Sequence, residues 1–446
     1  MRIIRFIKSL YLGTRVYYAV ALLILLFLIS YWVHLFFPIA LIGLWLLLLI
    51  ILFDCVTLYR TAEGITATRN LPEKFSNSDL NEVPLFIQNK YSFKIYYEII
   101  DEIPIQFQKR DFLKSGFIES KDRVAINYTL RPVDRGVYNF GNLNIYVHSP
   151  LQIIKRRYTF NNGQIVKVYP SFIQMKKYAF LAIDNKLTQF GLKKIRRIGH
   201  TMEFEQIKDY VTGDDVRTIN WKATAKRGSL MINQFQDEKS QPVYSIIDAS
   251  RVMKMPFNGL TLLDYAINST LAFSNIALKK NDKTGLITFS NSIQNHLAAS
   301  NKKTHLNIIL EILYAINTEF LDSDFGRLYA EVKRKITHRS LLLLYTNFEH
   351  ISSLHRQLPY LKGLSKKHVL VVIFFENTEL DTLIKKKAAN TPEIYHKTIA
   401  QKMEYDKKLM VKELEKHGIQ AVLTRPEDLS VNTINKYLEI KARGIL

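Results

Sequence analysis

Residues 16–53 form an apolar run that constrains the fold more than any other part of the chain, because they contain no Asp, Glu, Lys or Arg. One helix of this length would extend about 57 Å, roughly twice the ~30 Å hydrocarbon core of a bilayer. Because proline disrupts a continuous helix, we expect two spans with a break near Phe37 and Pro38. A cleaved signal peptide is the alternative, but the run is too long and has no small-x-small cleavage site. The run therefore predicts a retained transmembrane hairpin within residues 1–58.

Basic residues flank this hairpin on both sides. They are Arg2, Arg5, Lys8 and Arg15 before the first span, and Arg60, Arg69 and Lys74 after the second. The short connection between the spans has no Lys or Arg, so the positive-inside rule places both ends in the cytoplasm. We therefore predict a multi-pass protein of the inner (cytoplasmic) membrane with its soluble domains in the cytoplasm.

The whole chain is basic, with 62 Lys and Arg against 40 Asp and Glu and a formal charge of +22. Such an excess is compatible with nucleic acid, an anionic membrane or an acidic protein partner. No recognisable nucleic-acid module accompanies the charge, so we expect the bilayer and proteins as partners, and no nucleic acid. Cys55 is the single cysteine, which excludes an intramolecular disulfide.

Two soluble domains follow the hairpin. Residues 62–170 contain short apolar or alternating runs separated by turn formers, a spacing that predicts a small antiparallel β-sandwich. Residues 243–446 alternate apolar runs with helical patterns, which predicts an α/β, Rossmann-like domain with a mostly parallel sheet. Its candidate strands are 243–247, 284–289, 341–345, 369–374 and 419–424. The mostly helical insertion 380–416 carries an apolar stripe, for which core packing is the default and a docking surface the alternative.

The connecting segment, residues 171–242, holds a dense set of charged, aromatic and glycine residues. They are Arg197, Gly199, Glu203, Phe204, Tyr210, Gly213, Asp214, Asp215, Arg217 and Trp221. An acidic residue after a glycine and before residues 216–225 suits a helix start, because its carboxylate can accept free backbone N–H groups.

We expect the arginines, Glu203 and the two aspartates of this segment to form one charge network, with Tyr210 and Trp221 packed around it. Paired carboxylates beside arginine also fit an acid/base or metal site, but only His200 accompanies them and no nucleophile does. Ion-pair networks often imitate sites of this kind, so a structural or partner-binding role is favoured.

A second constellation, Asp248 and Ser250, follows the strand predicted at 243–247. A carboxylate and a hydroxyl at a strand end supply oxygen ligands for a hard cation, as in a metal-ion-dependent adhesion site. The usual site takes a second serine where this chain has Val252, and a second acidic residue where it has Asn347; Thr304 is a further hydroxyl candidate. We expect a degenerate site with weak Mg²⁺ binding or none, and no other cofactor.

With these residues in view, the chain resembles the DUF-fifty-eight family of bacterial membrane proteins from about residue 55 onward. The resemblance rests on the pattern R-x-G…E-F…Y-x-x-G-D-D-x-R-x-I-x-W-x-A-x-A, which begins at Arg197 and ends at Ala225. It is reinforced by residues 131–138, 149–151 and 168–170. The resemblance implies two N-terminal spans, a β domain, a C-terminal von Willebrand factor A-like domain, and association with a MoxR-type AAA+ ATPase that acts on client proteins.

These observations predict a non-enzymatic, membrane-anchored scaffold or adaptor. The sequence has no phosphate-binding loop, no H-E-x-x-H and no G-x-S-x-G motif. One alternative is an adhesion-type receptor outside the cytoplasm that binds its ligand through a metal at Asp248 and Ser250. A third hypothesis is a metal-dependent hydrolase that uses Asp214 and Asp215.

Overall fold

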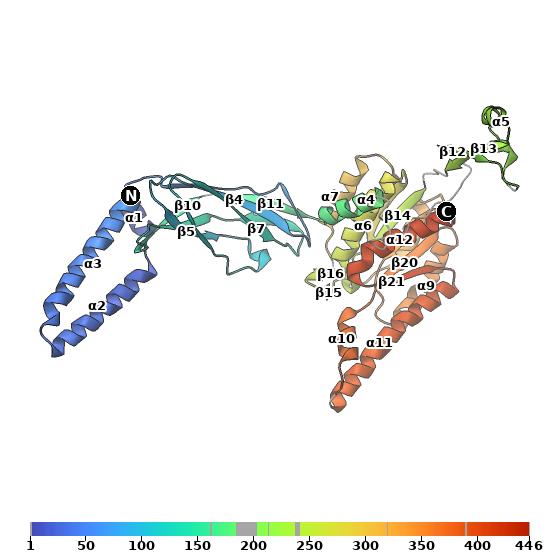
Figure 1. Ribbon diagram of the computed structural model, residues 1–446. Helices are drawn as coiled ribbons and strands as arrows, with labels where there is room; N and C mark the ends of the chain where they lie inside the picture. Colours follow the sequence, from blue (N-terminus) through green and yellow to red (C-terminus); the bar gives the residue numbers. More distant parts are fainter. Residues whose placement is uncertain are drawn as a thin grey trace. The chain divides into compact units, whose positions relative to one another are not determined.

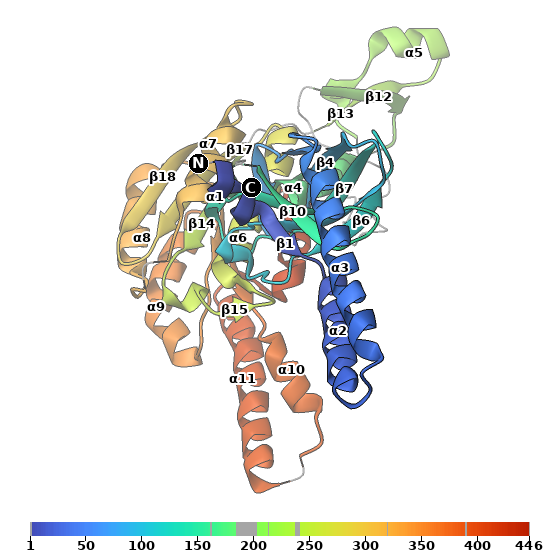
Figure 2. The same ribbon diagram turned by 90° about the vertical axis from the view of Figure 1, so that its left-hand side faces the viewer.

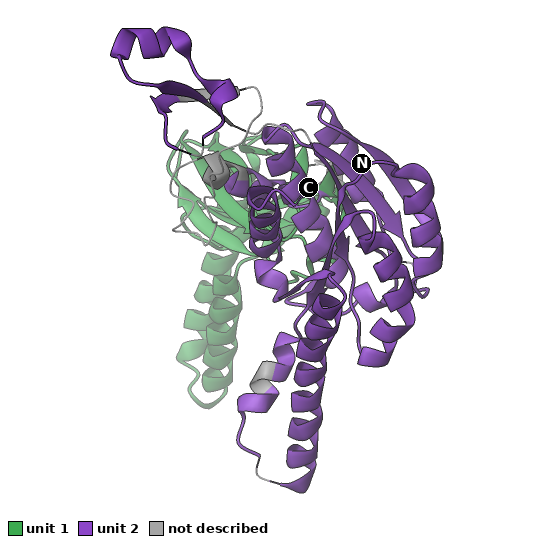
Figure 3. Cartoon of the chain, turned by 90° about the vertical axis from the view of Figure 1, so that its right-hand side faces the viewer, with its two compact units in different colours: residues 1–168 green, residues 169–446 purple. Residues whose placement is uncertain are grey.

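The computed structural model describes the whole chain except residues 1, 161–162, 184–202, 213, 237–240, 319, 389 and 446. The chain divides into two compact units, residues 1–168 and residues 169–446 (Figure 3). The fold is therefore best described one unit at a time.

The first unit begins with a pair of long apolar helices. Its first elements are α1 (Arg2–Ser9), β1 (Leu10–Leu12), α2 (Thr14–Trp32) and α3 (Phe36–Tyr59). Helices α2 and α3 lie side by side (Figures 1 and 2), and both are long and apolar enough to cross a membrane. Pro38 lies in the first turn of α3, where its missing N–H costs no helical hydrogen bond. The two predicted apolar helices are confirmed, with a break slightly before the predicted one, while insertion and orientation stay predictions.

Antiparallel sheets make up the rest of the first unit. The strands are β2 (Ile65–Arg69), β3 (Lys74–Ser76), β4 (Asn81–Asn89), β5 (Ile95–Asp101), β6 (Lys114–Ile118), β7 (Arg123–Leu130), β8 (Gly136–Phe140), β9 (Leu143–His148), β10 (Ile154–Phe160) and β11 (Gln164–Tyr169). They form sheets of order β1-β10-β9-β5-β6, β3-β11-β8 and β2-β4-β7. Alternate residues of β4 are buried, as expected of a strand with one face on a core.

The apolar hairpin is fixed to the five-stranded sheet. Strand β1 pairs antiparallel with β10, and the N–H of Gly13 donates to the carbonyl of Ile153 at 2.7 Å. The guanidinium of Arg156 donates to the carbonyls of Leu58 at 2.5 Å and Thr61 at 2.7 Å. The last carbonyls of a helix have no partner within the helix, so Arg156 stabilises the end of α3 where it meets the sheet.

The second unit contains one large sheet. Its strands are β14 (Pro242–Asp248), β17 (Lys283–Phe289), β18 (Ile293–Ser300), β19 (Leu341–Tyr345), β20 (Val369–Phe375) and β21 (Gln420–Thr424), in the order β18-β17-β14-β19-β20-β21. All neighbours pair parallel except β18, which runs antiparallel to β17. The predicted parallel strands are present; β18 was not predicted, because its residues are only half-buried and lack a clear apolar pattern.

Helices cover both faces of this sheet (Figure 1). Besides α5 (Trp221–Arg227), the helices of this unit are α4 (Phe172–Ile183), α6 (Leu262–Lys279), α7 (His305–Ala315), α8 (Phe325–Lys335), α9 (Ile351–Ser365), α10 (Thr378–Lys385), α11 (Thr391–Lys416) and α12 (Leu429–Ala442). Side chains on one face of the sheet pack against α6, α7 and α12. Side chains on the other face pack against α8, α9 and the C-terminal half of α11. Buried apolar residues on both faces explain the near-continuous apolar strands.

Candidate functional site

The motif segment folds into a hairpin of β12 (Glu203–Asp209) and β13 (Met231–Gln236) that holds a 3-10 turn (Val216–Thr218) and helix α5 (Trp221–Arg227). The side chain of Asp215 caps the 3-10 turn by accepting the N–H of Arg217 at 2.9 Å. Asn220 caps α5 by accepting the N–H of Ala223 at 3.0 Å, and Gly228 ends the helix in the left-handed conformation that glycine favours. The predicted capping by an aspartate is thus correct, but α5 begins later, at its own cap.

The structure describes part of the predicted charge network. Arg197, Gly199 and Gly213 lie outside the described residues, and Glu203 is described only as part of β12. The carboxylate of Asp214 accepts the N–H of Val211 at 3.0 Å and pairs with Lys208 rather than with Arg217. The hydrogen bond from Val211 lowers the pKa of Asp214, with Lys208 acting in the same direction. The two aspartates therefore shape the turn, which argues against a poised acid and base.

Trp221 does not pack into the motif, contrary to the expectation from sequence. It is 70% exposed on the first turn of α5. Among the described side chains of this hairpin, four other large apolar residues are exposed: Ile207, Val211, Val216 and Leu230. Exposed cations share the helix: Lys222, Lys226 and Arg227. We call this surface the Trp221 face; a large exposed aromatic surrounded by polar groups is typical of a protein-binding surface.

The second constellation forms at the carboxyl end of β14. Asp248 is fully buried, and its carboxylate accepts the N–H of Ser250 at 3.0 Å. The hydroxyl of Ser323 donates to Asp248 at 2.8 Å, and that of Thr346 donates to it at 2.7 Å. Burial raises the pKa of Asp248, while these hydrogen bonds act in the opposite direction.

Two of the hydroxyls at this carboxylate were missed by sequence reasoning. Ser323 lies in a loop far from Asp248 in the sequence, and no local pattern identifies it. Thr346 could have been identified from the sequence, because it directly follows the strand predicted at 341–345. The predicted hydroxyl, Thr304, instead lies exposed at the start of α7. The site therefore combines the ends of β14 and β19 with the loop before α8, rather than the set that was expected.

Asn347, the third predicted residue of this site, is held by a lysine. The ammonium of Lys407, from α11, donates to the side-chain oxygen of Asn347 and to the carbonyl of Phe348, both at 2.6 Å. Burial lowers the pKa of Lys407 to about 8, and the charge of Glu349 acts in the opposite direction. Lys407 thus supplies the positive charge that Asn347 contacts.

The oxygen set fits a divalent cation poorly. It offers one carboxylate, Asp248, whose oxygens already accept three hydrogen bonds, and the amide oxygen of Asn347 is occupied by Lys407. Hard cations take six or more oxygen ligands, usually with several charges among them. Among the described residues, no three His, Cys, Asp or Glu side chains gather as a metal-binding group. Weak Mg²⁺ binding stays a prediction.

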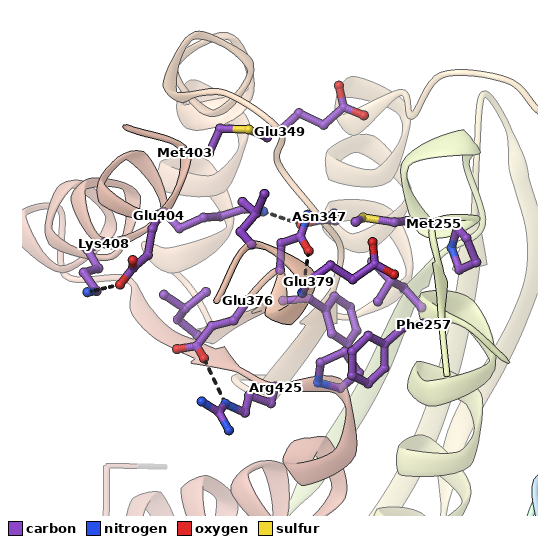
Figure 4. A pocket seen from close by; sticks show the side chains of 18 residues that line it. Met255, Phe257, Asn347, Glu349, Glu376, Glu379, Met403, Glu404, Lys408 and Arg425 are labelled. Atoms are coloured by element: carbon purple, nitrogen blue, oxygen red, sulfur yellow. Dashed lines mark hydrogen bonds and ion pairs between the residues drawn. The ribbon is translucent and has the colours of Figure 1, made fainter. Parts of the chain in front are cut away.

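A cavity of about 280 Å³ lies between the carboxyl ends of β19 to β21 and helix α11 (Figure 4). Its apolar lining includes Met255, Phe257, Phe375 and Leu423, and Lys407 reaches it from α11. At its rim, Glu404 pairs with Lys408 at 2.5 Å and Glu376 with Arg425 at 3.8 Å. The carboxyl edge is the edge at which open α/β sheets bind ligands.

Residues 206–417 match the family described as "Protein of unknown function DUF58". The resemblance predicted from the motif is confirmed over these residues, a shorter stretch than the one predicted. A segment of 174 residues is 24% identical to the uncharacterized protein YeaD of Bacillus subtilis (strain 168). That segment is 37% of this chain and spans 43% of the relative, less than half of its length.

Several solved structures are similar in part. A conserved hypothetical protein, BatB from Bacteroides thetaiotaomicron, matches 46% of this chain and 99% of its own, with 14% identity and a TM-score of 0.30. The ASH/PapD-like domain of human CEP192 matches 24% of this chain and 87% of its own, with 14% identity and a TM-score of 0.19. The CARDB domain of PF1109 from Pyrococcus furiosus matches 23% and 86%, with 13% identity and a TM-score of 0.17. TM-scores this low support no inference about the fold or the function of this chain.

Proposed function

We propose that this protein is a non-enzymatic scaffold, anchored in the cytoplasmic membrane by α2 and α3, that binds a protein partner in the cytoplasm through the Trp221 face. The observation that carries the proposal is the 70% exposure of Trp221 on a helix that is capped at both ends. Rigid aromatic side chains on well-ordered elements are the residues that most often dominate a protein interface.

The chemistry of the motif supports a binding role over a catalytic one. Asp214 and Asp215 accept backbone N–H groups within the turn that leads to α5. A general acid or base must instead reach a substrate and titrate near the working pH. The lowered pKa of Asp214 takes that carboxyl further from such a role.

A MoxR-type AAA+ ATPase is the partner we propose, on the strength of the motif's resemblance to the DUF58 family. Lys222, Lys226 and Arg227 are exposed cations on the same helix as Trp221, so the matching surface of the ATPase is expected to be acidic. The α/β domain of the second unit is proposed to be von Willebrand factor A-like, because its sheet is mostly parallel and Asp248 ends β14 beside two hydroxyls.

Binding of the purified full-length protein to a MoxR-type ATPase of the same cell tests this proposal. The Trp221→Ala variant is expected to raise the Kd by about tenfold or more, because an aromatic hot spot contributes roughly 1.4 kcal/mol or more. Tyr395→Ala is the matched control, since Tyr395 is an aromatic residue on α11 that is 67% exposed. Equal affinity of the Trp221 variant and the wild type would contradict docking through this face, and an absence of wild-type binding would contradict the partner.

The second candidate, a metal-dependent receptor exposed outside the cytoplasm, would have to bind its cation through the carboxylate and hydroxyl cluster around Asp248. That function requires saturable binding of Mg²⁺ or Mn²⁺ that depends on Asp248. Calorimetric titration of wild type and Asp248→Asn with each cation separates the two functions. The scaffold account expects no saturable heat from the wild type, whereas a saturable signal that Asp248→Asn abolishes would favour the receptor.

A further inference from the structure

Helix α1 is short and amphipathic. Ile4 and Ile7, one turn apart, are 60% and 65% exposed. Its sequence also holds three cations, Arg2, Arg5 and Lys8, at intervals of three residues. A helix with two isoleucines mostly open to solvent and three cations in its sequence has the composition of a helix that lies on a membrane surface.

Contacts fix α1 at the end of α3. The ring of Phe6 lies 4.6 Å from the ring of Tyr59, the last residue of α3. The hydroxyls of Ser9 and Tyr59 are 2.8 Å apart. Strand β1 follows α1 directly and pairs with β10. If α3 spans the bilayer, α1 is therefore held at the level of the bilayer surface.

The charge around α1 is strongly positive. Arg15, at the start of α2, and Arg60, at the end of α3, are both exposed. Asp54 and Glu63 are the acidic residues within positions 1–70. Asp54 is buried and accepts the N–H of Ile154 at 2.9 Å, and Glu63 pairs with Lys90 at 3.4 Å. The cations of α1 thus have no acidic side chains nearby in the sequence to neutralise them.

We propose that α1 lies in the plane of the cytoplasmic membrane surface and binds anionic lipids. Ile4 and Ile7 enter the boundary between headgroups and acyl chains, and Arg2, Arg5 and Lys8 bind lipid phosphates. Anionic lipids are the occupant that suits this surface, because the cations attract the negative leaflet and the exposed isoleucines need an apolar environment. This inference rests on the proposed membrane anchor, since α1 reaches the bilayer only if α2 and α3 span it.

The test uses the full chain in lipid nanodiscs, with Cys55→Ala and a fluorophore attached at Ile7→Cys. The discs contain either phosphatidylcholine alone or phosphatidylcholine with phosphatidylglycerol, and neutral acrylamide is the quencher. The quenching constant at position 7 is expected to be at least about twofold lower in the anionic discs at low salt, and to rise again at about 1 M NaCl. The triple variant Arg2→Gln/Arg5→Gln/Lys8→Gln should lose this difference between lipids.

Two controls separate the possible failures. Arg110→Gln/Lys114→Gln/Arg123→Gln removes three exposed cations of the same unit; Lys114 lies on β6, at the opposite edge of the sheet from β1. This triple should keep the lipid dependence. A label at Leu46→Cys, in the middle of α3, reports the anchor itself: full accessibility there overturns the membrane anchor. Shielding at position 46 with equal quenching at position 7 in both lipids overturns only the role of α1.

Discussion

Asp248 is a fully buried carboxylate that neighbouring hydrogen-bond donors stabilise. Its oxygens accept one backbone N–H and two hydroxyls, all within 3.0 Å. Because burial raises its pKa, the folded protein binds the proton at Asp248 more tightly than the unfolded chain does. The contribution of this residue to the free energy of unfolding therefore falls as pH rises above its unfolded pKa of about 3.9.

Asp248→Ala is expected to lower the free energy of unfolding by about 3 kcal/mol, because it leaves the buried N–H of Ser250 and the buried hydroxyl of Thr346 without an acceptor. Asp248→Asn should cost much less at pH 7, since an amide can still accept the N–H of Ser250 and donate to both hydroxyls. Urea denaturation of the detergent-solubilised protein measures both variants. If both substitutions lowered the free energy of unfolding equally, the site would require the negative charge of the carboxylate, and its hydrogen bonds alone would not explain its stability.

Lys407 predicts a pH dependence of the opposite sign. Its pKa of about 8 is below the unfolded value of about 10.4, so between these values the unfolded chain binds more protons at this site. The free energy of unfolding should therefore rise between pH 8 and pH 10 through this residue. Lys407→Met should flatten that rise in urea denaturation, whereas Lys408→Met, at an exposed neighbour, should leave it intact. Identical pH profiles for wild type and Lys407→Met would rule out a depressed pKa at this lysine.

At the scale of elements, α5 presents Trp221 on only seven residues and depends on its caps. Asn220 accepts the N–H of Ala223 and also donates to Asn233 of β13 at 2.8 Å. Without such caps, so short a helix would not hold its shape. The order of the Trp221 face therefore depends on the hydrogen bond between Asn220 and Asn233, which joins α5 to β13.

Asn220→Ala should cost about 1 kcal/mol and speed amide hydrogen exchange in α5 by about fivefold, because the cap and the link to Asn233 are both lost. Asn220→Asp is the matched variant, since it keeps the acceptor for Ala223 and loses only the donor. Exchange measured by mass spectrometry is expected to rank the two variants in that order. Unchanged exchange in Asn220→Ala would show that α5 is held by other contacts.

Elements with an unbroken or regular apolar pattern were predictable from sequence. β19 has the predicted bounds, because its residues follow a strand pattern to both ends. The apolar stripe of 380–416 was only partly core, as Met410 and Leu414 are buried and Tyr395 is exposed. Periodicity identifies a helix face, but it does not tell how far along the helix the core extends.

The candidate sites were less predictable than the strands. Asp248 and Ser250 are neighbours in sequence and appear together in the structure, whereas Ser323 reaches them from another loop. Trp221 was expected to pack, because a tryptophan in a dense motif is usually buried; its exposure depends on how α5 lies against β13. Contacts between distant loops leave no local pattern in a sequence.

At the scale of the whole molecule, the two units suit different tasks. The first joins two apolar helices to antiparallel sheets through β1 and Arg156, which suits a rigid anchor. The second carries the Trp221 face, the Asp248 cluster and the cavity beside α11. The proposed membrane-anchored scaffold would use this division, because the Trp221 face and the two apolar helices belong to different units.

The most direct test places a photo-crosslinking amino acid at position 221 of the full-length protein in its native membrane. The account predicts that ultraviolet light links position 221 to a MoxR-type AAA+ ATPase, identified by mass spectrometry, while the same amino acid at Tyr395 does not give this product. A crosslink at 221 only to extracytoplasmic proteins, or equal yields of the ATPase product at both positions, would contradict the account.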